Sequence, residues 1–203
     1  ITDCLMVDID GEVVEECKKH LPEMHQGAFE DSRTRVLYED ARAYLEKTKE
    51  RFDLIVVDLP EPLEEGPACL LFTTEFYTLI RDRLTDNGIM TMQAGMTKIN
   101  ELFFYGAVNR TLREVFPVVA PYQGFISCFG TPWGFILASK GTDPRKQTAR
   151  EIDGLISSRM NPDSLGYWNG AAHLHSFNLP KFLTNALAKN DRVITDKNPL
   201  IVS

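Results

Sequence analysis

Residues 52–59 have the sequence FDLIVVDL, which is the strongest strand signal in the chain. The run is apolar and rich in β-branched residues, and Pro60 and Pro62 follow it closely. Other strand-like runs occur before and after it, separated by segments with helical spacing. A chain that alternates strands and helices in this way is constrained to an α/β fold.

The alternation of strands and helices extends over most of the chain. Predicted strands cover residues 4–9, 35–39, 52–59, 89–93, 118–128 and 133–139. Predicted helices cover residues 11–21, 41–49, 76–84, 98–116, 152–159 and 180–187. The run 4–9 is expected to be a buried parallel strand, and Asn87-Gly88 is expected to turn the chain into strand 89–93.

The order of these elements predicts the fold class. Repeated βα units that close with two strands joined by a short turn indicate a Rossmann-like, methyltransferase-type doubly wound sheet. We expect this sheet to be mostly parallel with a C-terminal antiparallel pair. We also expect one catalytic domain over residues 1–203, because a chain of this length fits a single domain.

Composition excludes several function classes. The net charge of −7 argues against a nucleic-acid partner, because phosphates require a basic surface. No apolar stretch approaches the length needed to cross a membrane, and residues 1–8 lack the features of a signal peptide. The four cysteines include no C-x-x-C pair, so we expect neither zinc ligation nor a disulfide framework. We therefore expect a cytoplasmic protein that binds neither nucleic acid nor membrane.

Three predicted strands end in carboxylates, which are Asp8 with Asp10, Glu39 with Asp40, and Asp58 with Glu61. Each acid has a structural explanation, since it can cap the following helix or accept hydrogen bonds from loop amides. However, parallel neighbouring strands end at one rim of a sheet, where α/β folds bind ligands. Like charges gathered there cost stability unless a cationic or hydroxylated ligand pairs with them. The pattern favours a site for a nucleoside sugar and a polyamine.

Five segments, taken in order, carry a resemblance to a known family: MVDIDGEVVEECKKHLP, LYEDARAYL, FDLIVVDLPEP, FYTLIRDRLTDNGIMTMQAG and YWNGAAHLHSFNLP. They resemble the polyamine aminopropyltransferase (spermidine/spermine synthase) family from its second core strand to its C-terminus. The segment FGTPWGFILASK and the loop beginning DLPEP are more similar to the thermospermine-synthase branch.

The resemblance implies an activity in polyamine biosynthesis. An aminopropyl group passes from decarboxylated S-adenosylmethionine, a co-substrate, to a polyamine acceptor, and methylthioadenosine leaves. The resemblance implies small-molecule partners, a polyamine and a nucleoside, and no tightly bound cofactor. It also implies a homodimer or homotetramer.

The resemblance assigns residues to the nucleoside. Asp8 stands where the family has an acid, usually Glu, that hydrogen-bonds the ribose hydroxyls. Asp40 and Ala41 fall on the family's Asp-Gly pair, which contacts the adenine amino group. Pro67 falls on a loop proline that lines the nucleoside pocket.

The resemblance also assigns residues to the amine. Asp58 falls on the first acid of the family's D-[ST]-[ST]-D-P loop and is implied to be the catalytic base that accepts the amine proton. Glu61 takes the place of the second acid and is implied to hold the amine. The other implied substrate-binding residues are Gln93, Phe129, Trp168 and His173.

Two parts of the family pattern have no counterpart in the chain. They are the glycine-rich G-G-G-[DE]-G loop that ends the first core strand and the small N-terminal β-domain. The chain also starts at Ile1, without an initiator Met. We therefore expect an N-terminally truncated catalytic domain that lacks its first strand, and we expect the fragment alone to be inactive.

Two other functions stay open. An S-adenosylmethionine-dependent methyltransferase has the same fold, although a methyl acceptor rarely needs both Asp58 and Glu61. A non-catalytic family member would bind nucleoside or polyamine without turnover, and departures from the common pattern such as Asp8 and Ala41 keep this possibility open.

Two aromatic or imidazole features have competing interpretations. His173-Leu-His175 suggests a metal pair, but no carboxylate cluster or third histidine stands beside it, so we expect no metal. Trp133 is expected either to pack in the core or to line the amine site.

Overall fold

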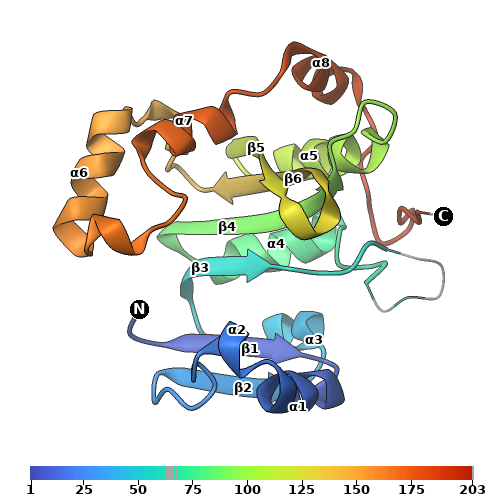
Figure 1. Cartoon of the computed structure of the whole chain (residues 1–203). Coiled ribbons are helices and arrows are strands. Elements are labelled where there is room, and N and C mark those ends of the chain that lie inside the picture. Colours follow the sequence, from blue (N-terminus) through green and yellow to red (C-terminus); the bar gives the residue numbers. More distant parts are fainter. Residues whose placement is uncertain (63–65, 67, 203) are drawn as a thin grey trace. The chain divides into compact units, whose positions relative to one another are not determined.

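The computed structural model describes residues 1–62, 66 and 68–202 (Figure 1). The chain divides into two compact units, Ile1–Lys49 and Glu50–Ser203, and each is described by itself. Within the described ranges, none of the helices combines the length and the apolar character that crossing a membrane requires.

The unit Ile1–Lys49 contains one parallel strand pair. β1 (Cys4–Asp8) pairs with β2 (Thr34–Tyr38), and α1 (Gly11–His20) and α2 (Pro22–His25) lie between them in the chain. α3 (Ala41–Lys47) follows β2. The βα alternation predicted for this region is confirmed. The prediction that the first strand is buried is wrong for the described chain, since no residue of β1 is fully buried and β2 is its only strand partner there.

The unit Glu50–Ser203 is built on a four-stranded sheet of order β3–β4–β6–β5 (Figure 1). Its strands are β3 (Phe52–Val57), β4 (Leu84–Met96), β5 (Val118–Ile126) and β6 (Thr131–Ser139). β3 and β4 are parallel, whereas β6 is antiparallel to both β4 and β5. The predicted C-terminal antiparallel pair is confirmed, and the fold is mixed α/β.

Helices pack against this sheet. α4 (Thr74–Arg83) and α5 (Phe103–Val115) contact β4, and α5 also contacts β5 and β6. α7 (Gly170–Phe177) packs on β5, α6 (Ala149–Arg159) packs on α7, and α8 (Lys181–Lys189) packs on α5.

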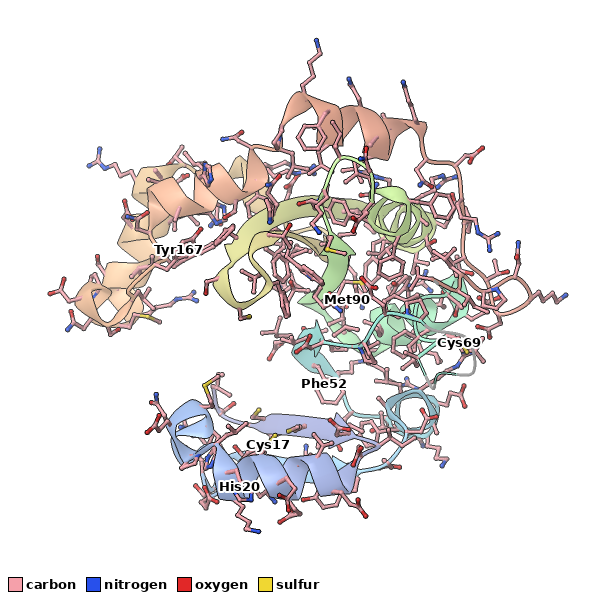
Figure 2. All side chains as sticks on the ribbon, turned by 45° about the vertical axis from the view of Figure 1, so that its right-hand side comes forward. Cys17, His20, Phe52, Cys69, Met90 and Tyr167 are labelled. Atoms are coloured by element: carbon pink, nitrogen blue, oxygen red, sulfur yellow. The ribbon has the colours of Figure 1, made fainter. Side chains whose placement is uncertain are left out.

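The alternation of side chains along β4 separates its two faces. Met90 and Met92 are buried, and the Tyr77 hydroxyl of α4 donates to Met92 Sδ at 3.5 Å. Figure 2 shows Met90 among the side chains in the interior of this unit. Thr91 and Gln93 are half-buried and point to the other face, because successive side chains of a strand alternate. Gln93 therefore lies on the face that α4 leaves uncovered.

A close approach between α5 and the sheet requires Gly134 in β6. The Tyr105 hydroxyl donates to the backbone carbonyls of Tyr122 at 3.0 Å and Phe135 at 3.1 Å. A Cβ atom at position 134 would lie 2.6 Å from the Tyr105 ring, so only glycine leaves room for this contact. Burial raises the pKa of Tyr105, and its phenol is a neutral donor at physiological pH.

Four elements differ from the sequence-based predictions, and one of them is α2 (Pro22–His25), which was not predicted. β4 begins at Leu84, so Asn87-Gly88 lies inside the strand and is not a separate turn before it. The two residues form an irregularity at which the β3–β4 register shifts. The helix predicted from residue 98 begins at Phe103. α7 was not predicted, because its sequence GAAHLHSF has little of the apolar spacing of a helix. The local signal for its start is Asn169, whose side chain caps the helix by accepting from Ala172 N at 2.8 Å.

The C-terminal segment ties the loop after β3 to the helices. Ile194 N donates to Thr111 Oγ1 at 3.0 Å, and the Ile194 carbonyl accepts from Thr74 N at 2.9 Å. Farther on, Val202 N donates to the Pro62 carbonyl at 2.9 Å. The segment thus supports the loop that carries Asp58 and Glu61.

Candidate functional site

A hollow of about 630 Å³ lies in the unit Glu50–Ser203 where β3 ends. Its polar lining consists of Asp58, Glu61 and Gln93. Its apolar lining consists of Leu59, Pro60, Met96, Ile126, Phe129, Trp133 and Phe135. The hollow therefore joins two carboxylates and one amide to a largely apolar and aromatic wall.

The two carboxylates have no protein partner in the described chain. Asp58 follows β3 directly and is exposed, and Glu61 is half-buried. Within residues 1–62, 66 and 68–202, neither carboxylate makes a hydrogen bond or an ion pair, and no Lys or Arg lines the hollow. Two carboxylates that line one hollow without a cation favour a positively charged ligand there.

Glu61 lies next to a backbone irregularity in β4. Gly95 has a φ of 85°, and the β4–β6 register shifts between Gln93 and Met96. A Cβ atom at position 95 would lie 2.8 Å from the Phe104 ring and 3.3 Å from Glu61 Oε1. Glycine therefore provides both the left-handed conformation and the space beside the Glu61 carboxylate.

Gln93 lines the hollow and bonds to three neighbours. Its Nε2 donates to the Leu59 carbonyl, in the loop between Asp58 and Glu61. Its Oε1 accepts from Trp133 Nε1 at 2.7 Å and from Gly95 N at 3.3 Å. The amide thus links the end of β3, β4 and β6.

Two aromatic rings form part of the wall of the hollow. Phe129 belongs to the short 3-10 turn Ser127–Phe129 between β5 and β6, and its side chain is 58% exposed. Its ring centroid lies 4.6 Å from that of Trp133, with 41° between the ring planes. Gly130, with a φ of 61°, ends the turn and returns the chain into β6. Trp133 is half-buried and lines the hollow, so it does not pack wholly in the core.

His173 does not line the hollow. It is buried in α7, and its Nε2 is 2.9 Å from the Pro144 carbonyl oxygen. Trp168 meets it edge-on with centroids 5.7 Å apart. From His173 a series of ring contacts runs through Phe177 and Tyr122 to Phe135. Trp168 and His173 are therefore connected to the hollow through packed aromatic rings, and neither residue belongs to its described lining.

Tyr122 fixes the middle of this series of rings. Its hydroxyl is 2.9 Å from Thr91 Oγ1, on the same face of β4 as Gln93. Burial raises the pKa of Tyr122, although the hydrogen bond with Thr91 lowers it. The phenol is neutral at physiological pH and serves as a packing and hydrogen-bonding group.

The strand-end acids of the unit Ile1–Lys49 have local roles. Asp10 caps α1 by accepting from Val13 N at 3.0 Å, and Asp8 Oδ1 accepts from Asp10 N at 2.9 Å. Asp40 caps α3 by accepting from Arg42 N at 2.7 Å and from Ala43 N at 3.0 Å. The cap interpretation of Asp10 and Asp40 is confirmed.

The remaining nucleoside residues can be placed only in part. Ala41 is the first residue of α3, directly after the Asp40 cap. Pro67 lies outside the described residues. No group of three or more His, Cys, Asp or Glu side chains in the described parts of the chain is arranged to hold a metal ion.

Sequence reasoning missed part of the wall. Ile126 and Phe135 were not assigned because they are ordinary apolar residues of predicted strands, and Met96 was not assigned because it lies beyond the end of predicted strand 89–93. The signal is the cross-strand register, which pairs Gln93 with Phe135 and Met96 with Trp133. Such pairings become visible only once the order of the strands is known.

Comparisons with known proteins show which family the sequence resembles. The family model of the spermine/spermidine synthase domain matches residues 1–148. A polyamine aminopropyltransferase of Synechococcus sp. (strain JA-2-3B'a(2-13)) is 40% identical over 98% of this chain and 64% of that protein. Polyamine aminopropyltransferase 2 of Hyperthermus butylicus is 37% identical over 97% of this chain and 64% of that protein. The chain thus spans about two thirds of the length of these curated relatives.

Solved structures agree with the sequence comparisons. Spermidine synthase from Thermotoga maritima superposes with a TM-score of 0.77 and 27% identity, covering 92% of this chain and 60% of that one. A spermidine synthase in complex with the transition state analogue AdoDATO superposes with a TM-score of 0.76 and the same identity and coverage. The Rossmann-like, methyltransferase-type fold predicted from the sequence is confirmed.

Proposed function

This chain belongs to the spermine/spermidine synthase family, and from that premise we propose that the whole protein is a polyamine aminopropyltransferase. It transfers an aminopropyl group from decarboxylated S-adenosylmethionine to an amine and releases methylthioadenosine. The observation that carries the proposal is the hollow where the carboxylates of Asp58 and Glu61 lie without a protein cation, beside an apolar wall.

The chemistry of this hollow suits an alkyl amine. An ammonium group satisfies the two carboxylates through charge-assisted hydrogen bonds, which are stronger than neutral ones. The methylene chain of the same molecule is apolar and gains from contact with the aromatic wall. A methyl acceptor without positive charge leaves both carboxylates unpaired, so the hollow favours an amine over other nucleophiles.

The proposed reaction is a displacement at carbon. The amine nitrogen uses its lone pair to bond to the aminopropyl methylene next to the sulfonium. The carbon–sulfur bond breaks, its electron pair goes to sulfur, and the sulfonium becomes the neutral thioether of methylthioadenosine. The positive sulfur is a good leaving group, so the protein mainly orients the amine and removes its proton.

Asp58 is the proposed proton acceptor. An ammonium has no lone pair, so the attacking nitrogen has to lose a proton to a base within hydrogen-bond reach. Asp58 is exposed and has no protein partner in the described residues, so its oxygens are available to the amine and to water. The proton passes from nitrogen to the carboxylate and then to solvent. Glu61, beside Gly95, holds the nitrogen in place.

The nucleoside site is proposed to include the strand-end acids of Ile1–Lys49. One oxygen of Asp8 bonds to Asp10 N, which fixes the carboxylate and leaves the other oxygen for a ribose hydroxyl. Asp40 and Ala41 are proposed at the adenine and Pro67 at the wall of the nucleoside pocket. We further propose that both units form one catalytic domain of a cytoplasmic homodimer or homotetramer. Trp168 and His173 are proposed to support the amine site through the aromatic series that ends at Phe135.

The test measures methylthioadenosine release by the whole protein with decarboxylated S-adenosylmethionine and a panel of diamines and longer polyamines. Amine-dependent release that collapses in Asp58→Asn supports the proposal, and the best amine identifies the acceptor. Methyl transfer from ordinary S-adenosylmethionine with no aminopropyl transfer identifies a methyltransferase instead. Nucleoside binding without turnover of either donor identifies a binding-only relative.

A further inference from the structure

Gln93 has a side-chain amide whose orientation is fixed by its neighbours. Trp133 Nε1–H and Gly95 N–H are donors only, and the Leu59 carbonyl is an acceptor only. If the amide were reversed, its NH₂ group would face two donors and its oxygen would face a carbonyl. The three neighbours therefore define one orientation, and Gln93 in turn holds all three.

The neighbours that Gln93 holds carry the chemistry of the hollow. Leu59 separates Asp58 from Pro60 and Glu61, so the bond to its carbonyl anchors the loop that presents both carboxylates. Trp133 is half-buried, and its indole N–H bonds its side chain to Gln93 of β4. Because the bond holds one edge of the indole, it restricts the ring to the orientation that contacts Phe129.

The strand register makes this arrangement specific. Gln93 is paired with Phe135, whereas Trp133 is paired with Met96 beyond the irregularity at Gly95. Gln93 reaches Trp133 diagonally across the two strands, and long side chains can make such contacts. Without the bond, the indole has no polar anchor among the described residues and is free to adopt other rotamers.

The charges of the hollow all come from one loop. Asp58 and Glu61 come from the loop after β3, and the wall formed by Met96, Phe129 and Trp133 carries no charge. A ligand that fits this arrangement has a cationic nitrogen followed by a methylene chain. The methylene chain lies against the apolar wall, so the area of contact depends on the length of the chain.

We propose that Gln93 is a positioning residue that locks the Asp58–Glu61 loop and Trp133 together, and that Trp133 is thereby held as the surface along which the methylene chain of the acceptor lies. This inference rests on the proposed function for the identity of the ligand. It assigns Trp133 as a specificity residue for alkyl amines and gives Gln93 an effect that is exerted mainly through Trp133 and to a smaller extent through the loop.

The first experiment observes the indole directly. In the ¹⁵N-labelled whole protein, the Nε1–H resonance of Trp133 is assigned by its absence in Trp133→Phe. Gln93→Leu removes the acceptor, so this resonance is expected to move upfield and to exchange faster with water. Gln93→Glu keeps an oxygen for the indole and is expected to leave the resonance near its original position. Gln147→Leu, a half-buried glutamine outside the lining, is the matched control and is expected to change nothing.

The second experiment measures how acceptor length affects kcat/KM. Burial of one methylene is worth roughly fourfold, so wild type is expected to gain by about this factor for each methylene that Trp133 covers. Gln93→Leu and Trp133→Phe are both expected to flatten this dependence. In a double-mutant cycle, Gln93→Leu is expected to lower kcat/KM at least about tenfold when Trp133 is present. In the Trp133→Phe background the same substitution is expected to lower kcat/KM less than about threefold, because the effects of coupled residues are not additive.

The outcomes separate this inference from the proposed function. An unmoved indole resonance in Gln93→Leu, or additive losses in the cycle, overturns the positioning role. If wild type transfers no aminopropyl group, the indole resonance is followed during titration with diamines. A shift that depends on the amine and disappears in Gln93→Leu then supports the inference while the proposed reaction fails. Absence of any shift in wild type overturns both.

Discussion

The two units use strand-end acids in opposite ways. In Ile1–Lys49, Asp10 and Asp40 each follow a strand and accept hydrogen bonds from the first turn of the next helix. In Glu50–Ser203, Asp58 follows β3 and Glu61 lies three residues farther on, and neither has a partner in the described part of the chain. The same sequence signal thus corresponds to a satisfied group in one unit and to an unsatisfied group in the other.

The difference arises from the residues that come after each strand. A helix that starts directly after a strand presents free backbone N–H groups, which a carboxylate satisfies. The residues after β3 include Pro60 and Pro62, which have no N–H to donate. Asp58 and Glu61 therefore have no helix to cap, and their oxygens stay unpaired in the described part of the chain. Partners, rather than position at a strand end, distinguish the structural acids from those proposed to bind the amine.

Asp58→Asn is expected to give the largest effect in a test of this contrast. Loss of a positioned general base costs about 10²- to 10⁴-fold in rate, so methylthioadenosine release is expected to fall by that factor. The free energy of unfolding is expected to change by less than about 0.5 kcal/mol, because the carboxylate is exposed and unpaired. The measurements are single-turnover kinetics and urea unfolding. Full activity in the variant removes Asp58 from the chemistry.

Glu61→Gln is expected to act on binding more than on the chemical step. Losing one charge-assisted hydrogen bond to an ammonium is expected to raise the acceptor KM roughly 10- to 100-fold, with a smaller change in kcat. Steady-state kinetics with the preferred amine measures both parameters. Glu12→Gln, on the exposed surface of α1, is the control for a general loss of negative charge. Equal losses in both variants mean that net charge, and not the position of Glu61, matters.

Local sequence signals predicted most of the first unit and the central strands. The FDLIVVDL run, the helix predicted over residues 76–84 and the antiparallel pair near the C-terminus were all recognisable, because each depends on residues that are close in the sequence. Threonine and aspartate caps are also short-range interactions. The extended β4 was not recognisable, since its irregularity at Asn87-Gly88 resembles a turn until β3 is placed beside it.

The arrangement of the candidate site depends on long-range contacts. The bond from Trp133 to Gln93 spans 40 residues, and the contact of Tyr105 with Phe135 spans 30. Family resemblance drew attention to Asp58, Glu61 and Gln93 but gave no reason to connect Gln93 with Trp133. The buried position of His173 likewise follows from the packing of α7, an element that the sequence pattern did not reveal.

Caps in the first unit are expected to respond differently from Asp58 to the same substitution. Asparagine replaces aspartate well as a helix cap, whereas alanine costs about 1 kcal/mol. Asp10→Ala is therefore expected to lower the free energy of unfolding by about 1 kcal/mol and Asp10→Asn by only a few tenths. Urea unfolding with circular dichroism measures both. If the asparagine variant is as unstable as the alanine variant, the charge of Asp10 matters and the contrast with Asp58 is weakened.

Asp143 provides the smallest and most selective test, because it is an acid of the second unit that has a partner. Its Oδ1 accepts from Arg145 N at 3.0 Å, and its two oxygens form a bidentate pair with the Arg145 guanidinium at 2.8 Å. The hydrogen bonds from the Arg145 side chain are the main cause that lowers the pKa of Asp143 below 3.8. A depressed pKa in the folded state means that the stabilisation is present above the unfolded pKa and is lost as the pH falls through the folded pKa.

We therefore expect Asp143→Asn to lower the free energy of unfolding by about 0.5 kcal/mol at neutral pH, as is typical of a surface ion pair. The difference between wild type and variant is expected to shrink as the pH falls below about 4. Urea titrations at several pH values measure it, and aminopropyl transfer at neutral pH is expected to stay unchanged. A difference that grows in acid contradicts the sign of the pKa shift. A loss of transfer activity instead means that a paired acid of this unit also serves the reaction, and pairing then no longer separates the structural acids from the functional ones.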